Sequence, residues 1–162
     1  MQKLYSAAAI ESRVKDMANT INKTYAGLTC PIHIVVVMNG SFVFAADLVR
    51  HLKCKTILHF VGGSYFQSGI KHEVGIDVDA FPKDFKQAPV LVIEDILDNG
   101  TSFEKIKLSL KACNAAHVRL CTLLKRQNAD IQPDFCGFTI TKETFVVGYG
   151  LDLDGQYRHL PD

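Results

Sequence analysis

Three acidic side chains follow one short apolar run in the middle of the chain. The run covers residues 89–93, and Glu94, Asp95 and Asp98 come directly after it. Neighbouring residues of an extended chain point in opposite directions, so Glu94 and Asp95 can bind two separate hydroxyls of a ribose or serve a Mg²⁺ ion through water. The pattern therefore indicates polar chemistry at the end of a buried strand.

The next four residues, Asn99, Gly100, Thr101 and Ser102, have the composition of a phosphate-binding turn. The glycine allows a tight turn in which successive backbone N–H groups converge, and both hydroxyls stand at the start of a helix. Residues 101–104, Thr-Ser-Phe-Glu, also match the T-x-x-E capping box. Carboxylates above such a turn indicate a sugar phosphate whose 5′-phosphate lies on the turn.

Other classes of site share parts of this pattern. Acids at a strand end also occur in receiver domains and in P-loop ATPases, and T-x-x-E can be only a helix cap. The sequence contains no G-x-x-x-x-G-K-[ST] and no G-x-G-x-x-G after a strand, which excludes the P-loop and dinucleotide interpretations. The receiver-domain and simple-cap interpretations stay open at this point.

Strands and helices are expected to alternate around this motif. The stripe Ile10, Val14, Met17 and Ile21 predicts an amphipathic helix within residues 6–25. Helices are also predicted at 41–53 and after residue 100, and the polar stretch 62–79 is expected to be a functional loop. Short apolar, β-branched runs predict strands over residues 32–38, 56–61, 89–93, 118–124 and 145–148.

This alternation predicts an α/β fold with a central, mainly parallel sheet flanked by helices, formed as one domain over residues 1–162. In such sheets ligands bind beyond the carboxyl ends of the strands. The chemistry is therefore expected at the strand ends, where the three acids lie.

Composition argues against several function classes. Lys and Arg total 18 against 17 Asp and Glu, a net charge of +1, so there is no basic footprint for nucleic acid. Apolar stretches fall short of the roughly 20 residues that span a bilayer, and the N-terminus lacks the pattern of a signal peptide. The five cysteines form no C-x-x-C pair, and we interpret them as reduced core thiols of a cytoplasmic protein.

Four segments together resemble a known family. Residues 90–102, VLVIEDILDNGTS, look like the 5-phosphoribosyl 1-pyrophosphate (PRPP) signature of the type I phosphoribosyltransferases. The segments 38–50 (MNGSFVFAADLVR), 63–65 (GSY) and 145–161 (FVVGYGLDLDGQYRHLP) are similar to the hypoxanthine-guanine branch. The resemblance implies the type I fold with a small C-terminal hood, and Mg²⁺-dependent transfer of phosphoribose from PRPP to hypoxanthine and guanine.

The resemblance also implies roles for the phosphoribose-binding residues. Glu94 and Asp95 would bind the ribose hydroxyls, and residues 98–102 the 5′-phosphate. Asp98 would also lie near N7 of the purine and exchange a proton with it, which is general acid–base catalysis. The pyrophosphate would be bound by Asn39, Gly40, Ser41 and Arg158, and Mg²⁺ by Glu94, Asp95 and Asp152.

Purine recognition is assigned in the same way. Phe145 would stack on the base, the backbone of Val146 would read its edge, and Asp152 would lie beside it. The family's lysine for the 6-oxygen follows a leucine pair; here Lys125 and Arg126 are both candidates, which differ in geometry. Ser64 and Tyr65 would belong to a mobile loop that closes over the reacting centre.

The sequence departs from the family at Asn39, which stands where Lys or Arg is usual, and by one extra residue between Ile140 and Phe145. A xanthine-preferring or pyrimidine-type transferase therefore stays an alternative. A nucleotide-sensing, RNA-binding regulator on the same fold is a second alternative, disfavoured by the near-neutral charge. The resemblance implies a homodimer or homotetramer, without a nucleic-acid or membrane partner.

Overall fold

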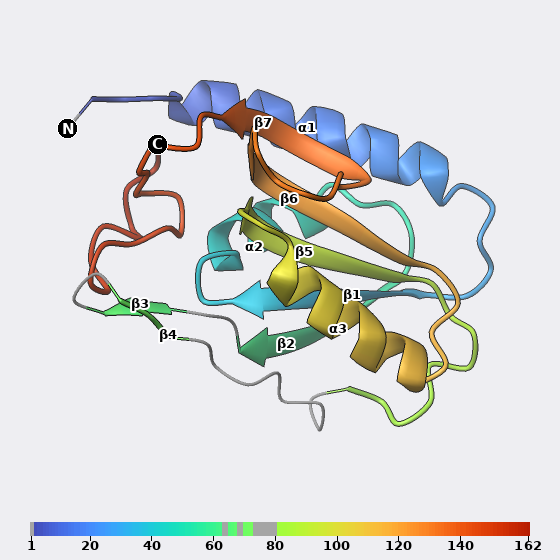
Figure 1. Ribbon diagram of the computed structural model, residues 1–162. Helices are drawn as coiled ribbons and strands as arrows, with labels where there is room; N and C mark the ends of the chain where they lie inside the picture. Colours follow the sequence, from blue (N-terminus) through green and yellow to red (C-terminus); the bar gives the residue numbers. More distant parts are fainter. Residues whose placement is uncertain (1, 63–64, 68–69, 73–80) are drawn as a thin grey trace.

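The architecture is that of a computed structural model, which describes residues 2–62, 65–67, 70–72 and 81–162 (Figure 1). Helices and strands alternate along most of the chain, as the sequence predicts. The elements are α1 (Ala7–Thr24), β1 (Ile32–Met38), α2 (Phe42–Val49), β2 (Thr56–Gly62), β3 (Tyr65–Gln67), β4 (Ile70–His72), β5 (Val90–Leu97), α3 (Thr101–Ala112), β6 (Val118–Arg126) and β7 (Phe135–Ile140).

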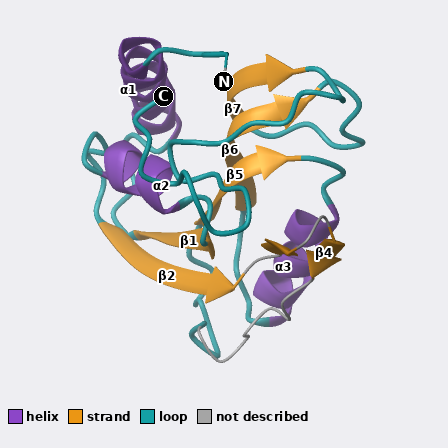
Figure 2. Ribbon diagram, turned by 90° about the vertical axis from the view of Figure 1, so that its left-hand side faces the viewer, coloured by secondary structure: helices purple, strands orange, loops and turns teal. Residues whose placement is uncertain are grey.

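Five strands form a parallel sheet in the order β2-β1-β5-β6-β7. Helices α1 and α2 cover one face and α3 covers the other (Figure 2). The predicted α/β class with a parallel sheet flanked by helices is confirmed. Among the described residues, no helix has the length and apolar character needed to cross a membrane.

Strand β5 is the centre of both hydrophobic layers. Leu91 and Ile93 pack toward α1 and α2, whereas Val90 and Val92 pack toward α3. All four are fully buried, as expected for an interior strand of a parallel sheet. Because both faces are held in this way, the polar carboxyl end of β5 has a fixed position.

Helix α1 forms for the reasons that its sequence indicates. Ser6 caps it, since its Oγ accepts a hydrogen bond from the N–H of Ala9 at 3.2 Å. The predicted stripe is buried against the sheet, and Val14 and Ile21 are almost completely inaccessible.

One predicted strand does not form, and one observed strand was not predicted. The run at 145–148 is not a strand: Gly148 forms only an isolated bridge with Leu151, and positive φ angles at residues 148–150 interrupt extended pairing. The last strand of the sheet is instead β7, which the sequence analysis did not predict. Its short run contains Gly137, and glycine weakens a strand signal.

Two local predictions also need correction. The capping box at residues 101–104 does not form, because Gly100 is the N-cap residue of α3 and Thr101 is already its first helical residue, with no side-chain cap. The cysteines are all free, but only Cys121 is buried and Cys30 is exposed. They are therefore not uniformly core thiols.

Candidate active site

Residues 39–41, which are predicted to bind pyrophosphate and are called the pyrophosphate loop below, lie beside the acidic end of β5, because β1 and β5 are parallel neighbours. The Asp95 carboxylate lies against Gly40 so closely that a Cβ atom at residue 40 would overlap Asp95 Oδ2. Oδ1 of Asp95 accepts a hydrogen bond from the N–H of Ile96 at 2.9 Å. A glycine at position 40 is thus what allows the loop to approach the acid.

The electrostatic environment of Asp95 disfavours its charge. Burial raises the pKa of the Asp95 carboxyl to about 6, and the charge of Asp152 acts in the same direction. Hydrogen bonds from backbone N–H groups lower this pKa, as does the positive charge of Arg158, but together they offset only part of the shift. A cation or several hydroxyl donors placed here would therefore stabilise the ionised form. The neighbouring Glu94 is buried, with 8% of its surface exposed.

The turn after β5 has the features of an anion site. Gly100 has a φ of +86° and α3 begins at Thr101, while Oδ1 of Asn99 accepts a hydrogen bond from the Thr101 N–H at 3.0 Å. Asp98, Asn99 and Thr101 are exposed. The turn thus presents polar groups at the N-terminus of a 12-residue helix, where an anion is favoured.

Arg126 lies against Asp98. Its Nε is 3.1 Å from Asp98 Oδ1, and its Nη1 donates to the carbonyl oxygens of Thr141, Lys142 and Thr144 at 2.8–3.1 Å. Lys125 instead donates from Nζ to Oε1 of Gln132 at 2.7 Å. Of the two cationic candidates, Arg126 is the one that connects Asp98 to the segment leading into Phe145.

The apolar candidates for purine binding differ in exposure. Phe145 exposes 63% of its surface, whereas Val146 is half-buried against the core. Phe145 follows Thr144, whose carbonyl accepts a hydrogen bond from Arg126, and its exposed aromatic ring can stack on a flat ligand without rearrangement of the core.

The C-terminal segment, residues 141–162, brings Arg158 and Asp152 together. Arg158 Nη2 is 2.8 Å from Asp152 Oδ1, and Arg158 Nη1 donates to the carbonyl oxygen of Gly150 at 2.7 Å. Gly150 lies against the carbonyl of Gly40, with no room there for a Cβ atom. In Figure 1 this segment, drawn in red, lies beyond the carboxyl ends of the strands. The segment that carries the charged pair therefore contacts the pyrophosphate loop through Gly150.

Ser41 is an unusual polar residue of the pyrophosphate loop. It is completely buried, and within the described residues its Oγ has no hydrogen-bond partner. A buried hydroxyl without a partner is energetically unfavourable. A ligand oxygen that reaches this loop would remove that penalty.

The described residues contain no cluster of three or more His, Cys, Asp or Glu side chains that could hold a metal. Glu94, Asp95 and Asp152 are thus not gathered into a ready-made three-ligand site. A partly buried Asp95 with a raised pKa nevertheless fits Mg²⁺, which is usually held by one or two carboxylates together with substrate phosphates and water.

Ser64 lies outside the described residues, and Tyr65 is the first residue of the short antiparallel strand pair β3–β4.

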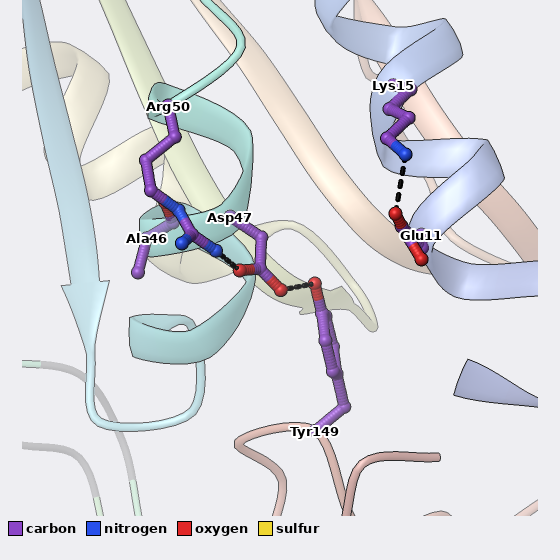
Figure 3. Close-up of polar contacts among 6 residues, drawn as sticks. All are labelled: Glu11, Lys15, Ala46, Asp47, Arg50 and Tyr149. Atoms are coloured by element: carbon purple, nitrogen blue, oxygen red, sulfur yellow. Dashed lines mark hydrogen bonds and ion pairs between the residues drawn. The ribbon is translucent and has the colours of Figure 1, made fainter. Parts of the chain in front are cut away.

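The sequence analysis did not single out Tyr149 or Asp47, which connect the C-terminal segment to α2 (Figure 3). Their separation of 102 positions gives no local signal.

Comparison with known proteins identifies the family of the chain. Residues 1–154 match the family model described as a phosphoribosyl transferase domain. The chain therefore belongs to the type I phosphoribosyltransferase family, in its hypoxanthine (hypoxanthine-guanine) branch.

Individual relatives place it in that branch. The chain is 34% identical over 167 residues to the hypoxanthine phosphoribosyltransferase of Buchnera aphidicola, covering 98% of this chain and 91% of the relative. It is 33% identical to the hypoxanthine-guanine phosphoribosyltransferase of Lactococcus lactis, with 98% and 86% coverage. The crystal structure of a hypoxanthine-guanine phosphoribosyltransferase from Bacillus anthracis superimposes with a TM-score of 0.83 at 32% identity, covering 99% of this chain and 94% of that one.

Proposed function

We propose that this chain is a purine salvage enzyme that transfers phosphoribose from PRPP to hypoxanthine and to guanine, giving IMP or GMP and pyrophosphate. The observation that carries the proposal is the convergence of two other segments on Asp95 at the end of β5. The Gly40 loop touches its carboxylate, and Arg158 and Asp152 from the C-terminal segment act on its charge. The names of the relatives supply the substrate class.

The phosphoribose half of the substrate would lie along the end of β5. Glu94 and Asp95 would bind the ribose hydroxyls, and residues 98–102 would bind the 5′-phosphate. The exposed turn and the N-terminus of α3 support this placement, because backbone N–H groups there favour a dianion. These contacts would hold the sugar in place while C1′ loses its bond to pyrophosphate and forms a bond to the purine.

The pyrophosphate would lie between Asn39–Ser41 and Arg158. Arg158 is a fork donor suited to phosphate oxygens, and Ser41 supplies a buried hydroxyl that needs a partner. Because Asn39 is neutral, charge compensation would depend on the backbone N–H groups and on Arg158. These groups would stabilise the negative charge that develops on the leaving pyrophosphate.

We propose Mg²⁺ as the cofactor, held by Asp95, Glu94 and Asp152 together with substrate oxygens. When bound, the ion would neutralise charge on the pyrophosphate and so favour its departure. Asp95 would serve as the carboxylate that the cation keeps ionised. Asp152 would have to share its oxygens with Arg158, which contacts it at 2.8 Å.

The base would bind between the Asp98–Arg126 pair and Phe145. Asp98 would exchange a proton with N7 of the purine as the new glycosidic bond forms. Arg126, with Lys125 as the second candidate, would provide positive charge toward the 6-oxygen. Phe145 would stack on the ring, the Val146 backbone would read its edge, and Ser64 and Tyr65 would belong to a loop that excludes water.

Assembly and location form further parts of the proposal. Strand β2 is at the edge of the sheet and exposes Ile57, Leu58 and Phe60. An apolar sheet edge of this kind favours a second copy of the chain as a partner, in a homodimer or homotetramer that light scattering can measure. The free cysteines support a cytoplasmic location, where thiols stay reduced.

The test is a spectrophotometric assay with PRPP, Mg²⁺ and each of hypoxanthine, guanine, xanthine and adenine in turn. We expect turnover with hypoxanthine and guanine, little with xanthine or adenine, and loss of turnover when a chelator removes Mg²⁺. Absence of turnover with all four bases would contradict the proposed function. Turnover with xanthine alone would support the alternative substrate preference.

A further inference from the structure

One side-chain hydrogen bond joins the C-terminal segment to the helix that follows the pyrophosphate loop. The hydroxyl of Tyr149 donates to Oδ2 of Asp47 at 2.7 Å. Asp47 is in the last half of α2, which begins at Phe42, one residue after Ser41. Figure 3 shows the tyrosine reaching across from its loop to the helix.

Tyr149 is held in this orientation from its backbone as well. Only 8% of the residue is exposed, and its N–H donates to the carbonyl oxygen of Leu160 at 2.7 Å. Its φ of 49° is rare for a residue with a side chain. Burial raises the pKa of the phenol, and the bond to Asp47 acts in the same direction, so the hydroxyl stays a donor.

The next residue extends this contact toward the substrate site. Gly150 lies on the carbonyl of Gly40, and its own carbonyl accepts a hydrogen bond from Arg158 Nη1 at 2.7 Å. A continuous series of contacts thus runs from Asp47 through Tyr149 and Gly150 to Arg158. The series relates the position of the arginine to that of the pyrophosphate loop.

We propose that Tyr149 and Asp47 are positioning residues that set the distance between Arg158 and the pyrophosphate loop. The inference rests on the proposed function, because it assigns one side of the pyrophosphate site to the pyrophosphate loop and the other to the C-terminal segment. A ligand that bridges two segments binds more tightly when their separation is fixed in advance. The Tyr149–Asp47 bond provides that preorganisation without touching the substrate.

Asp47 offers a way to separate this role from simple stabilisation of α2. Its other oxygen, Oδ1, pairs with Arg50 within the same helix, and Arg50 Nε donates to the carbonyl of Ala46 at 3.1 Å. Removing Arg50 therefore disturbs the helix contact and leaves the bond to Tyr149 in place. Asp47→Asn keeps an acceptor oxygen for Tyr149 and loses the ion pair.

The experiment compares the KM for PRPP, kcat and melting temperature of the full chain and its variants at saturating hypoxanthine. We expect Tyr149→Phe and Asp47→Ala each to raise the KM for PRPP about fivefold, with kcat changed less than twofold. The two changes together should raise KM no further than the larger single effect. Arg50→Gln and Asp47→Asn should leave the KM within twofold of wild type.

Hydrogen exchange over residues 148–160 gives a readout that does not depend on turnover. We expect faster exchange in Tyr149→Phe and Asp47→Ala than in Asp47→Asn or wild type. If Tyr149→Phe does not fold, the comparison of Asp47→Ala with Asp47→Asn carries the test.

An unchanged KM in Asp47→Ala, additive effects in the double variant, or an equal rise in Arg50→Gln would overturn the positioning role. Inactive wild type would instead refute the proposed function, while hydrogen exchange would still test the contact.

Discussion

The guanidinium of Arg126 lies 3.1 Å from the carboxylate of Asp98, from Nε to Oδ1. The two residues belong to neighbouring parallel strands or their ends, since β5 and β6 run side by side. The same guanidinium holds three carbonyls of residues 141–144. Arg126 therefore couples the proposed proton-transfer acid to the segment that carries Phe145.

Asp98→Asn should remove most turnover while substrate binding is largely retained. The amide keeps the size of the side chain but cannot exchange a proton with N7, and general acid–base catalysis contributes roughly 10²–10⁴-fold. Steady-state kinetics with both substrates saturating measure the loss in kcat. An unchanged kcat would contradict the proton-transfer role.

Arg126→Ala should raise the KM for hypoxanthine and lower the free energy of unfolding by about 1–3 kcal/mol. The change leaves three carbonyls and one carboxylate without their cationic partner. Lys125→Ala should have the smaller effect on that KM, because Lys125 Nζ contacts Gln132. The KM for hypoxanthine and the denaturant unfolding of the two variants measure these effects. A larger rise in KM for Lys125→Ala than for Arg126→Ala would indicate that Lys125 contacts the 6-oxygen.

Activity should fall on the acid side with a midpoint near pH 6. The pKa of Asp95 is raised to about 6 by burial, so the carboxyl gains a proton below that pH and no longer favours a cation. The pH profile of kcat/KM for PRPP measures this limb. In Asp95→Asn we expect the limb to disappear along with most of the activity.

Asp95→Asn should also stabilise the fold above pH 6. In the unfolded chain the carboxyl ionises near its ordinary value of 3.8, so its charge destabilises the fold above the folded pKa of about 6. This penalty is relieved as the pH falls from 6 to 3.8. We expect the variant to be more stable by about 1–3 kcal/mol at pH 7.5 and equally stable near pH 3.5. Equal stability at both pH values would indicate a carboxyl with an ordinary pKa.

Gly150→Ala should lower the melting temperature and weaken PRPP binding. The residue has a φ of +101°, and a Cβ atom there would overlap the carbonyl of Gly40. Gly155→Ala is the matched control, since its φ is +79° and nothing lies within 4 Å of the added atom. The control should lose only the roughly 1–2 kcal/mol of left-handed strain, and thermal unfolding with PRPP titration compares the two. Equal losses of stability and of PRPP binding in the two variants would show that the close contact of residue 150 with Gly40 is unimportant.

Phe145→Ala should weaken purine binding and leave stability within about 0.5 kcal/mol of wild type. Phe145 exposes 63% of its surface, so removal of its ring opens no cavity. Loss of stacking should weaken purine binding by about 1 kcal/mol, and the KM for hypoxanthine should rise accordingly. Phe145→Tyr retains a stacking ring and should keep a normal KM. A stability loss with an unchanged KM would show that the ring is structural.

Local sequence determined the elements and the proposed phosphoribose motif. The spacing of Ile10, Val14, Met17 and Ile21 was enough for α1, and the apolar run before Glu94 was enough for β5. Helix periodicity and strand runs are short-range signals, so they can be read without knowing the fold. The strand predicted at 145–148 does not form, because the positive φ angles of residues 148–150 turn the chain whatever its hydrophobicity.

Tertiary structure decided which of the candidate residues meet. The contacts of Asp95 with Gly40, of Arg126 with Asp98 and of Tyr149 with Asp47 join segments far apart in the chain. Side-chain type gives the chemistry each residue can perform, but strand order and loop path determine its neighbours. The raised pKa of Asp95 likewise depends on burial, which only the packed molecule provides.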